Sequence, residues 1–296
     1  MKNYVKSSQE ETTIIIPGLA KDLRIMQITD THLCEVYQQE GEELRRIAGE
    51  RHSGFRGQGQ PGDFTLTDLL HEHIRLSNEN KVDGVVFTGD IIDFPSVKNL
   101  DVMRSAFGDI QMPYLYMLGN HDWSFPHLPI NDKVRTDSYR LFHEWFSNIY
   151  GCNALQVGGV ILIAIDNSNY QLSEEQFAFI RKQCGLGLPC LLFMHIPLYL
   201  PSLEPQVRAN WGSAIMMGAK DWTEQELANW QVRHPDESTL QFTEWIRSGK
   251  DSEQIKGVFC GHIHFNHVDP ITPGRMQHTT LAGYLGGSRI IHLKKT

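Results

Sequence analysis

The chain of 296 residues lacks any apolar stretch that approaches the ~18 consecutive residues of a membrane-spanning helix. Its N-terminus also lacks the continuous apolar segment of a secretory signal. Internal repeats, low-complexity tracts and linker-like stretches are missing as well. These absences predict a single domain without a membrane span that works in the cytoplasm.

Cysteine is scarce and shows no pairing pattern. The five cysteines are odd in number and include no C-x-x-C pair; they are Cys34, Cys152, Cys184, Cys190 and Cys260. This usage favours reduced thiols over a disulfide scaffold.

The chain has no excess of basic residues, because 27 lysines and arginines face 35 aspartates and glutamates, for a formal net charge of −8. This balance argues against a nucleic-acid partner, since binding to phosphate backbones needs a surface rich in lysine and arginine. A small phosphorylated substrate stays compatible with an acidic chain, because bound cations invert the local field.

Short apolar runs rich in β-branched residues are present, and each ends in a polar cluster. They span residues 23–28, 82–87, 113–118, 159–165, 189–194 and 255–259. Near-continuous apolar runs are typical of strands buried on both faces of a sheet. Helical patterns lie between many of them, with caps expected at Asp63 or Thr65 and capping boxes at Ser173 and Ser238. The alternation predicts an α/β layered fold with covered sheets.

Two segments fit neither pattern: residues 35–63, which are polar and glycine-rich, and residues 200–237, which hold three tryptophans. Long insertions beside a site are often lids or specificity loops. Decoration that faces solvent is the alternative for either segment.

Side chains that can bind a metal ion or transfer a proton follow directly after the apolar runs. They are Asp30, His32, Asp90, Asn120, His121, His195, His262 and His264. Because ligands of open α/β sheets bind beyond the carboxyl ends of strands, we expect these side chains to meet. Aspartate, histidine and asparagine without thiolates suit Mn, Fe, Zn or Mg.

The same residues fall into five short blocks, each weak as a motif by itself. The blocks are D-x-H (30–32), G-D-x-x-D (89–93), G-N-H-D (119–122), H-x-P (195–197) and G-H-x-H (261–264). In this order the chain resembles the calcineurin-like metallophosphoesterases over about residues 23 to 264. The resemblance implies a four-layer α-β-β-α sandwich of two mixed sheets, in one domain over 1–296, with insertions at about 35–63 and 200–237.

The resemblance also implies two ligand sets that share one carboxylate. Asp30, His32, Asp90 and His264 would hold one ion, and Asp90, Asn120, His195 and His262 would hold the second. The ions would be divalent or of mixed valence, drawn from Mn, Fe, Zn and Mg. Two cations about 3.5–4 Å apart need such a shared anion and clamp both the attacking and the leaving oxygen. Gly261 is expected to leave room for them.

The implied reaction is hydrolysis of a phosphomonoester or phosphodiester by a metal-bound hydroxide, without a phospho-enzyme. His121 would protonate the leaving oxygen or stabilise the charge of the transition state, and the neighbouring Asp122 would orient the His121 imidazole. Asp93 would fix the geometry of the loops around the ligand residues or serve as a helix cap. Among members of the family, the chain looks closest to bacterial phosphohydrolases that include cyclic-nucleotide phosphodiesterases.

Other functions remain open from sequence: a nuclease on the same scaffold, and a non-catalytic interaction protein. His52, Arg56 and His267 are weaker candidates for substrate contact. We expect Trp211, Trp222 and Trp230 to pack in the fold and not to stack on bases. The sequence does not indicate an oligomeric state.

Overall fold

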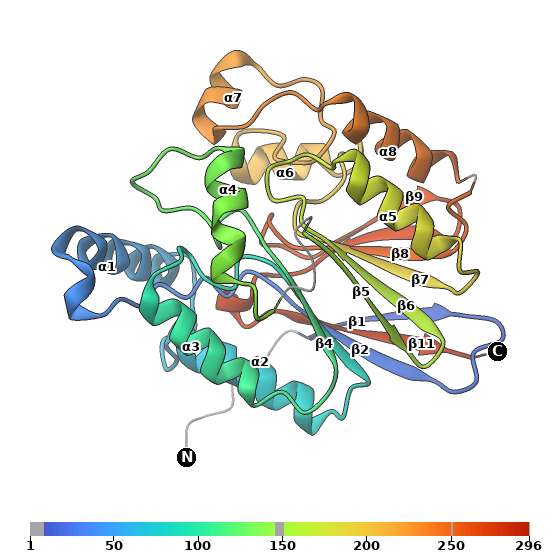
Figure 1. Cartoon of the computed structure of the whole chain (residues 1–296), viewed down its shortest axis with the longest axis horizontal. Helices are drawn as coiled ribbons and strands as arrows, with labels where there is room; N and C mark the ends of the chain where they lie inside the picture. Colours follow the sequence, from blue (N-terminus) through green and yellow to red (C-terminus); the bar gives the residue numbers. More distant parts are fainter. Residues whose placement is uncertain (1–8, 146–150, 250, 296) are drawn as a thin grey trace.

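Two mixed β-sheets lie face to face in the computed structural model, which describes residues 9–145, 151–249 and 251–295 (Figure 1). The first sheet has the order β1-β11-β2-β3-β4, with bounds Gln9–Ile15, Ser288–Lys294, Leu23–Ile28, Gly84–Thr88 and Tyr114–Met117. Strands β2, β3 and β4 run parallel, and β11 pairs antiparallel with β2.

The second sheet has six strands in the order β5-β6-β7-β8-β10-β9. Their bounds are Cys152–Val157, Val160–Ile165, Cys190–Met194, Ile255–Cys260, Arg275–Thr279 and His267–Thr272. Strands β6, β7, β8 and β10 are parallel, and the edge strands β5 and β9 pair antiparallel with their neighbours.

Helices cover the outer face of each sheet. On the first sheet lie α1 (Glu42–Gly57), α2 (Leu66–Glu79) and α3 (Val97–Gly108), and α4 (Asp132–Ser138) packs at its end. On the second lie α5 (Glu174–Cys184), α6 (Glu204–Trp211), α7 (Glu224–Trp230) and α8 (Glu237–Ser248). Short 3-10 turns occur at Gln38–Glu40, Tyr139–Leu141 and Gly283–Leu285.

Three apolar cores hold the layers together. The central core joins the two sheets through side chains such as Ile25, Val86, Leu191 and Phe259, all fully buried. Each outer core joins one sheet to its helices. The four-layer α-β-β-α sandwich in a single α/β domain is thereby confirmed.

Local sequence signals set most element boundaries. Thr65 caps α2 by accepting a hydrogen bond from the Asp68 amide at 3.0 Å, and Ser173 caps α5 in the same way. The capping box at Ser238 was wrong, since α8 begins at Glu237 and its cap is Asp236, which accepts from the Thr239 amide at 2.9 Å. Aspartate caps a helix as well as serine does, and here it comes two residues earlier.

The polar segment 35–63 forms helix α1, which the sequence patterns did not predict. Its buried residues Ile47, Ala48 and Phe55 pack against the core of the first sheet. Strands β1, β5, β9 and β10 were also missed: the first three are edge strands, and β10 has the sequence RMQHT, with one apolar residue. No helix in the described ranges has the length and hydropathy to cross a bilayer.

Candidate metal centre

Loops after β2, β3, β4, β7 and β8 meet where the two sheets end, and they bring the five sequence blocks together. The amide of Asp30 donates to the Gly89 carbonyl at 3.0 Å, and the amide of His32 donates to the Asp90 carbonyl at 2.9 Å. The amide of Gly261 donates to the His195 carbonyl at 3.0 Å. These main-chain bonds fix the relative positions of neighbouring loops, two within the first sheet and one within the second.

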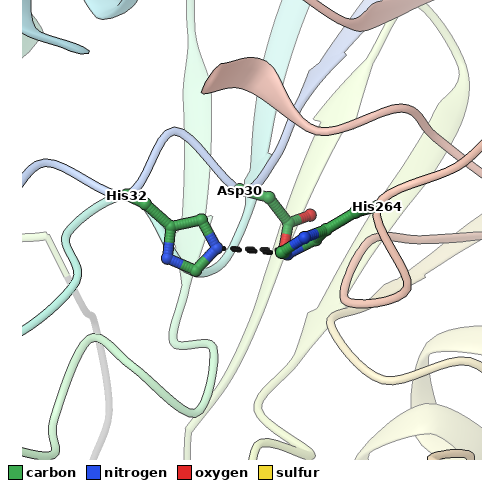
Figure 2. Close-up of side chains that lie close together, drawn as sticks. All are labelled: Asp30, His32 and His264. Carbon is green, nitrogen blue, oxygen red and sulfur yellow. Dashed lines mark hydrogen bonds and ion pairs between the residues drawn. The ribbon is translucent and has the colours of Figure 1, made fainter. Parts of the chain in front are cut away.

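Asp30, His32 and His264 form the first cluster (Figure 2). His264 Nε2 lies 3.3 Å from Asp30 Oδ1 and 3.2 Å from His32 Nε2. His32 Nε2 is 3.8 Å from Asp30 Oδ1. One ligand atom from each residue lies within 4.8 Å of the others, a spacing that suits a single cation.

Asp90, His195 and His262 form the second cluster, and Asn120 lies beside it. His195 Nε2 is 3.1 Å from Asp90 Oδ2 and 3.2 Å from Asn120 Oδ1. Asp90 Oδ2 is also 3.8 Å from His32 Nε2 in the first cluster. The carboxylate of Asp90 therefore lies between the two clusters.

The orientation of the histidine rings shows that their lone pairs face the centre. His195 Nδ1 donates to the Thr88 carbonyl at 2.7 Å, so in the neutral ring Nε2 is an acceptor. That acceptor points at two oxygen acceptors, Asp90 Oδ2 and Asn120 Oδ1. Three converging acceptors repel one another unless a proton or a cation lies among them, so this set of nitrogen and oxygen atoms fits a divalent cation.

The pKa shifts of Asp30 and His195 also indicate that a positive charge is stabilised at the centre. Burial alone would raise the pKa of Asp30, but the hydrogen bond to His264 and the charges of His264 and His195 together outweigh burial and lower the pKa to about 2. Burial alone would lower the pKa of His195, but the carboxylate of Asp90 raises it to about 10. The buried carboxylates thus stabilise a positive charge on their neighbours, which a bound cation would supply instead.

Left-handed backbone conformation is concentrated at the centre. Nine non-glycine residues of the described chain have positive φ, and five of them carry the clustered side chains. The five are Asp30 (52°), His32 (48°), Asp90 (52°), His262 (71°) and His264 (62°). Such conformations cost about 1–3 kcal/mol each and persist where the surrounding structure enforces them, which is typical of functional sites.

Two glycines give the carboxylates room. A Cβ atom at Gly261 would overlap Thr29 Oγ1 and Asp30 Oδ2, and one at Gly119 would overlap the carboxylate of Asp90. The prediction that a side chain at position 261 would crowd the centre is confirmed.

His121 lies at the edge of the clusters with 30% of its side chain exposed. Its amide donates to Asp90 Oδ1 at 2.8 Å, and its Nδ1 is 3.2 Å from Asp93 Oδ1. Burial lowers the pKa of His121, but the charges of Asp90 and Asp93 outweigh burial, so the pKa is raised. The imidazole is held from one side and open to solvent on the other.

The prediction that Asp122 orients His121 was wrong. The carboxylate of Asp122 accepts from the main-chain amides of Asp90 at 2.8 Å, Gly119 at 2.6 Å and Ile92 at 3.0 Å. Burial and the charge of Asp90 raise the pKa of Asp122 to about 7. Asp122 therefore ties the loops after β3 and β4 together, and proximity in sequence did not place it beside the imidazole.

Asp93 is the carboxylate that contacts His121, and it contacts two more cationic or donor groups. Asp93 Oδ1 is 3.0 Å from His32 Nδ1, a contact that agrees with the predicted role of fixing the surroundings of the ligand residues. Arg51 binds both carboxylate oxygens, with Nε and Nη2 each at 2.6 Å. The helix-cap alternative is wrong, since Ser96 caps α3.

Arg51 is a residue that sequence reasoning missed. It lies on α1, four residues from each of the buried side chains Ile47 and Phe55. The i, i+4 spacing puts all three on one helix face, and this spacing was the signal that could have identified Arg51. The weaker candidates bind elsewhere: His52 contacts Glu35, Arg56 the Gly62 carbonyl, and His267 Asp269.

Two tyrosines hold histidines of the G-H-x-H block, and no sequence signal indicated them. Tyr170 Oη lies 2.8 Å from His262 Nε2, and Tyr284 Oη lies 3.2 Å from His264 Nδ1. Each hydroxyl occupies one ring nitrogen and leaves the other for the centre. Such contacts fix ring orientation and tautomer at metal sites.

The three tryptophans differ in their surroundings. Trp222 is buried, and Trp211 Nε1 donates to the Ile263 carbonyl at 3.0 Å, as the prediction of packing roles requires. Trp230 packs near Trp211 and also lines a cavity beside His121.

Known proteins with a similar sequence or fold point to one family. The family model for calcineurin-like phosphoesterases matches residues 23–266. A purple acid phosphatase from yellow lupin (Lupinus luteus) seeds has a similar fold, with a TM-score of 0.55, 14% identity, and coverage of 92% of this chain and 45% of that chain. A dimetal phosphatase from Danio rerio gives a TM-score of 0.49, 15% identity and 88% coverage of both chains.

The chain thus spans less than half the length of the lupin phosphatase, and that likeness shows the fold alone. No curated protein sequence matches the chain. The family model covers most of the sequence and all five blocks. The chain belongs to the calcineurin-like phosphoesterase family.

Proposed function

We propose that the protein is a metal-dependent phosphoesterase that hydrolyses a small phosphomonoester or phosphodiester. The observation that carries the proposal is the convergence of side chains from five strand-end loops around the buried carboxylate of Asp90. A member of the calcineurin-like phosphoesterase family with this arrangement has the donor set for two cations.

The ligand sets proposed from the sequence agree with the two clusters. Asp30, His32 and His264 would hold one ion and His195, His262 and Asn120 the other, with Asp90 between them. The ions would be divalent or of mixed valence, and oxygen and imidazole ligands suit Mn, Fe, Zn or Mg. When bound, such a pair lowers the pKa of water and neutralises charge on a phosphoryl group.

His121 would donate the proton that the leaving oxygen requires. Its Nδ1 contacts Asp93, so the proton available to substrate is on Nε2. Asp93 fixes the ring plane and stabilises its protonated form, which is the part assigned from sequence to Asp122.

Arg51 would bind a phosphoryl oxygen of the substrate. Two of its five N–H donors go to Asp93, and the guanidinium also lines the cavity beside His121. A planar guanidinium fixed by a carboxylate is well suited to phosphate recognition. Helix α1, which belongs to the insertion at 35–63, would thereby contribute to the site.

The alternatives from sequence gain no support from the structure. A nuclease would need a basic surface, and the net charge is −8. A non-catalytic protein would not need His121 at the edge of a complete donor set.

Metal analysis followed by a substrate panel tests the proposal. Purified protein should hold two transition-metal or magnesium ions per chain when supplied with them, and should hydrolyse nitrophenyl mono- or diesters. Asp90→Asn should lower both metal content and turnover, whereas the matched surface change Asp137→Asn should leave both unchanged. Protein that binds no divalent cation under any loading condition refutes the proposal.

A further inference from the structure

A cavity of about 430 Å³ extends from the metal centre toward the surface. Asn120, His121 and Arg51 line its inner end. Two of its walls come from residues 123–132, which run from the loop after β4 to the first residue of α4, and from residues 229–233, at the end of α7 and just after it. Figure 1 shows this loop and α7 at the same end of the molecule, and the Ile130 amide joins them by donating to Gln231 Oε1 at 3.0 Å.

Apolar side chains dominate the two walls. Phe125, Leu128 and Ile130 lie on one side, and Trp230 and Val232 lie on the other. Leu128 keeps 47% of its surface exposed although it is a large apolar residue. A ligand that covers these side chains would gain free energy in proportion to the apolar area removed from water.

Amide side chains in the cavity are already engaged in holding the walls. Asn131 Oδ1 caps α4 through the Val134 amide at 3.0 Å, and Gln231 Oε1 accepts from Ile130. Asn169 Nδ2 donates to Asp132 Oδ1 at 2.7 Å. The same amide side chains that line the cavity therefore also hold its walls in place.

Charged side chains near the outer end of the cavity form ion pairs with one another. Arg233 Nη2 lies 3.3 Å from Asp132 Oδ2, and Arg135 Nε lies 3.6 Å from Asp132 Oδ1. A charged organic group would have to compete with these pairs, whereas an uncharged group leaves them intact.

We propose that this cavity binds the organic group of the substrate, and that this group is flat, apolar and uncharged, as in an aryl phosphoester. The inference rests on the proposed phosphoesterase function. Arg51 and His121 take the phosphoryl end, and the aromatic and aliphatic walls take the rest. The insertion at 200–237 supplies one wall and so acts in specificity.

Phosphonates test the inference without hydrolysis, because their carbon–phosphorus bond is stable. Inhibition of the Mn-loaded protein is measured with methylphosphonate, phenylphosphonate and 2-carboxyethylphosphonate, against a nitrophenyl ester as substrate. Phenylphosphonate should bind at least about ten-fold more tightly than methylphosphonate, from the apolar area of the ring. The carboxyethyl compound should bind no more tightly than methylphosphonate.

Wall variants assign the preference to the cavity. Trp230→Ala should lower the ratio of the methyl to the phenyl inhibition constant by about ten-fold, and Leu128→Ala by about three-fold. Leu186→Ala is the matched control, because Leu186 is also an exposed leucine, at 62%, outside the cavity. It should leave the ratio unchanged.

The outcomes separate the two levels of the proposal. Turnover with equal inhibition by methyl- and phenylphosphonate overturns the aryl pocket and leaves the phosphoesterase function in place. Tighter binding of the carboxyethyl compound overturns the pocket in the same way. Metal-loaded protein that hydrolyses no ester and binds no phosphonate overturns the function, and the pocket with it.

Discussion

Replacing Arg51 by methionine tests whether helix α1 is anchored to the metal centre. The substitution removes two hydrogen bonds of 2.6 Å to a fully buried carboxylate, Asp93, and keeps the length of the side chain. Arg46→Met is a matched control on the same helix, because Arg46 pairs with Glu50 at the same distance of 2.6 Å but in solvent.

The structure gives the expected size of the effect. Removing one partner of a buried ion pair costs about 3–5 kcal/mol. The Arg51 side chain is 36% exposed, so solvent screening reduces the expected loss of unfolding free energy to about 1–3 kcal/mol. Side chains of Arg46 and Glu50 are 58% and 62% exposed, and surface pairs of this kind contribute about 0–0.5 kcal/mol.

Urea unfolding in the presence of EDTA measures the difference without a contribution from bound metal. Arg51→Met should shift the midpoint downward, and Arg46→Met should shift it little. A difference between the two variants below about 0.5 kcal/mol would show that Asp93 does not depend on Arg51 and would refute the reasoning.

Three further changes test other parts of the site and fold. Gly261→Ala should reduce metal content below two ions per chain and cost about 1–3 kcal/mol, because the new Cβ overlaps Thr29 and Asp30; full metal content would contradict this. His121→Ala should lower kcat by about 10²–10⁴-fold for alkyl esters but less for nitrophenyl esters, whose leaving group needs no proton; an equal loss for both would exclude a proton-donor role. Burial and then the charge of Arg289 lower the pKa of His278 to about 3, so the unfolded chain binds the extra proton and stability falls as pH drops below about 6.5. His278→Gln should reduce this slope by up to about 1.4 kcal/mol per pH unit in urea unfolding between about pH 6 and pH 4, and an unchanged slope would show that His278 is not responsible.

Local patterns in the sequence were enough to predict six of the strands. The apolar run 23–28 is β2 without any shift of its bounds, and the runs that became β3, β4, β6, β7 and β8 agree within two residues. These signals can be read from a short stretch of sequence, because the apolar pattern of a buried strand and the cap of a helix each involve only a few consecutive residues. The same signals failed at the edge strands β1, β5 and β9, which bury less surface, and at β10, which contains a single apolar residue.

The candidate ligand residues could be named from sequence because each follows a buried strand. Their meeting point is a property of parallel strands, whose carboxyl ends share one edge of the sheet. The structure brings Asp30, His32, Asp90, His195, His262 and His264 into two clusters around that edge, with Asn120 beside the second.

The supporting contacts depended on tertiary structure. Asp93, and not the adjacent Asp122, contacts His121, and Arg51 reaches Asp93 from a helix 42 residues away in the chain. Tyr170 reaches His262 across 92 residues. Such pairings are set by how helices and loops pack, and sequence separation carries no information about them.

The sequence by itself determined six of the strands, the family and the candidate metal ligands, because these follow from short-range burial patterns and motif order. Only the tertiary structure decided which carboxylate contacts His121, which arginine binds that carboxylate and where the cavity beside them lies. Those features arise from side chains that meet across different elements, and their geometry exists only once the layers have packed.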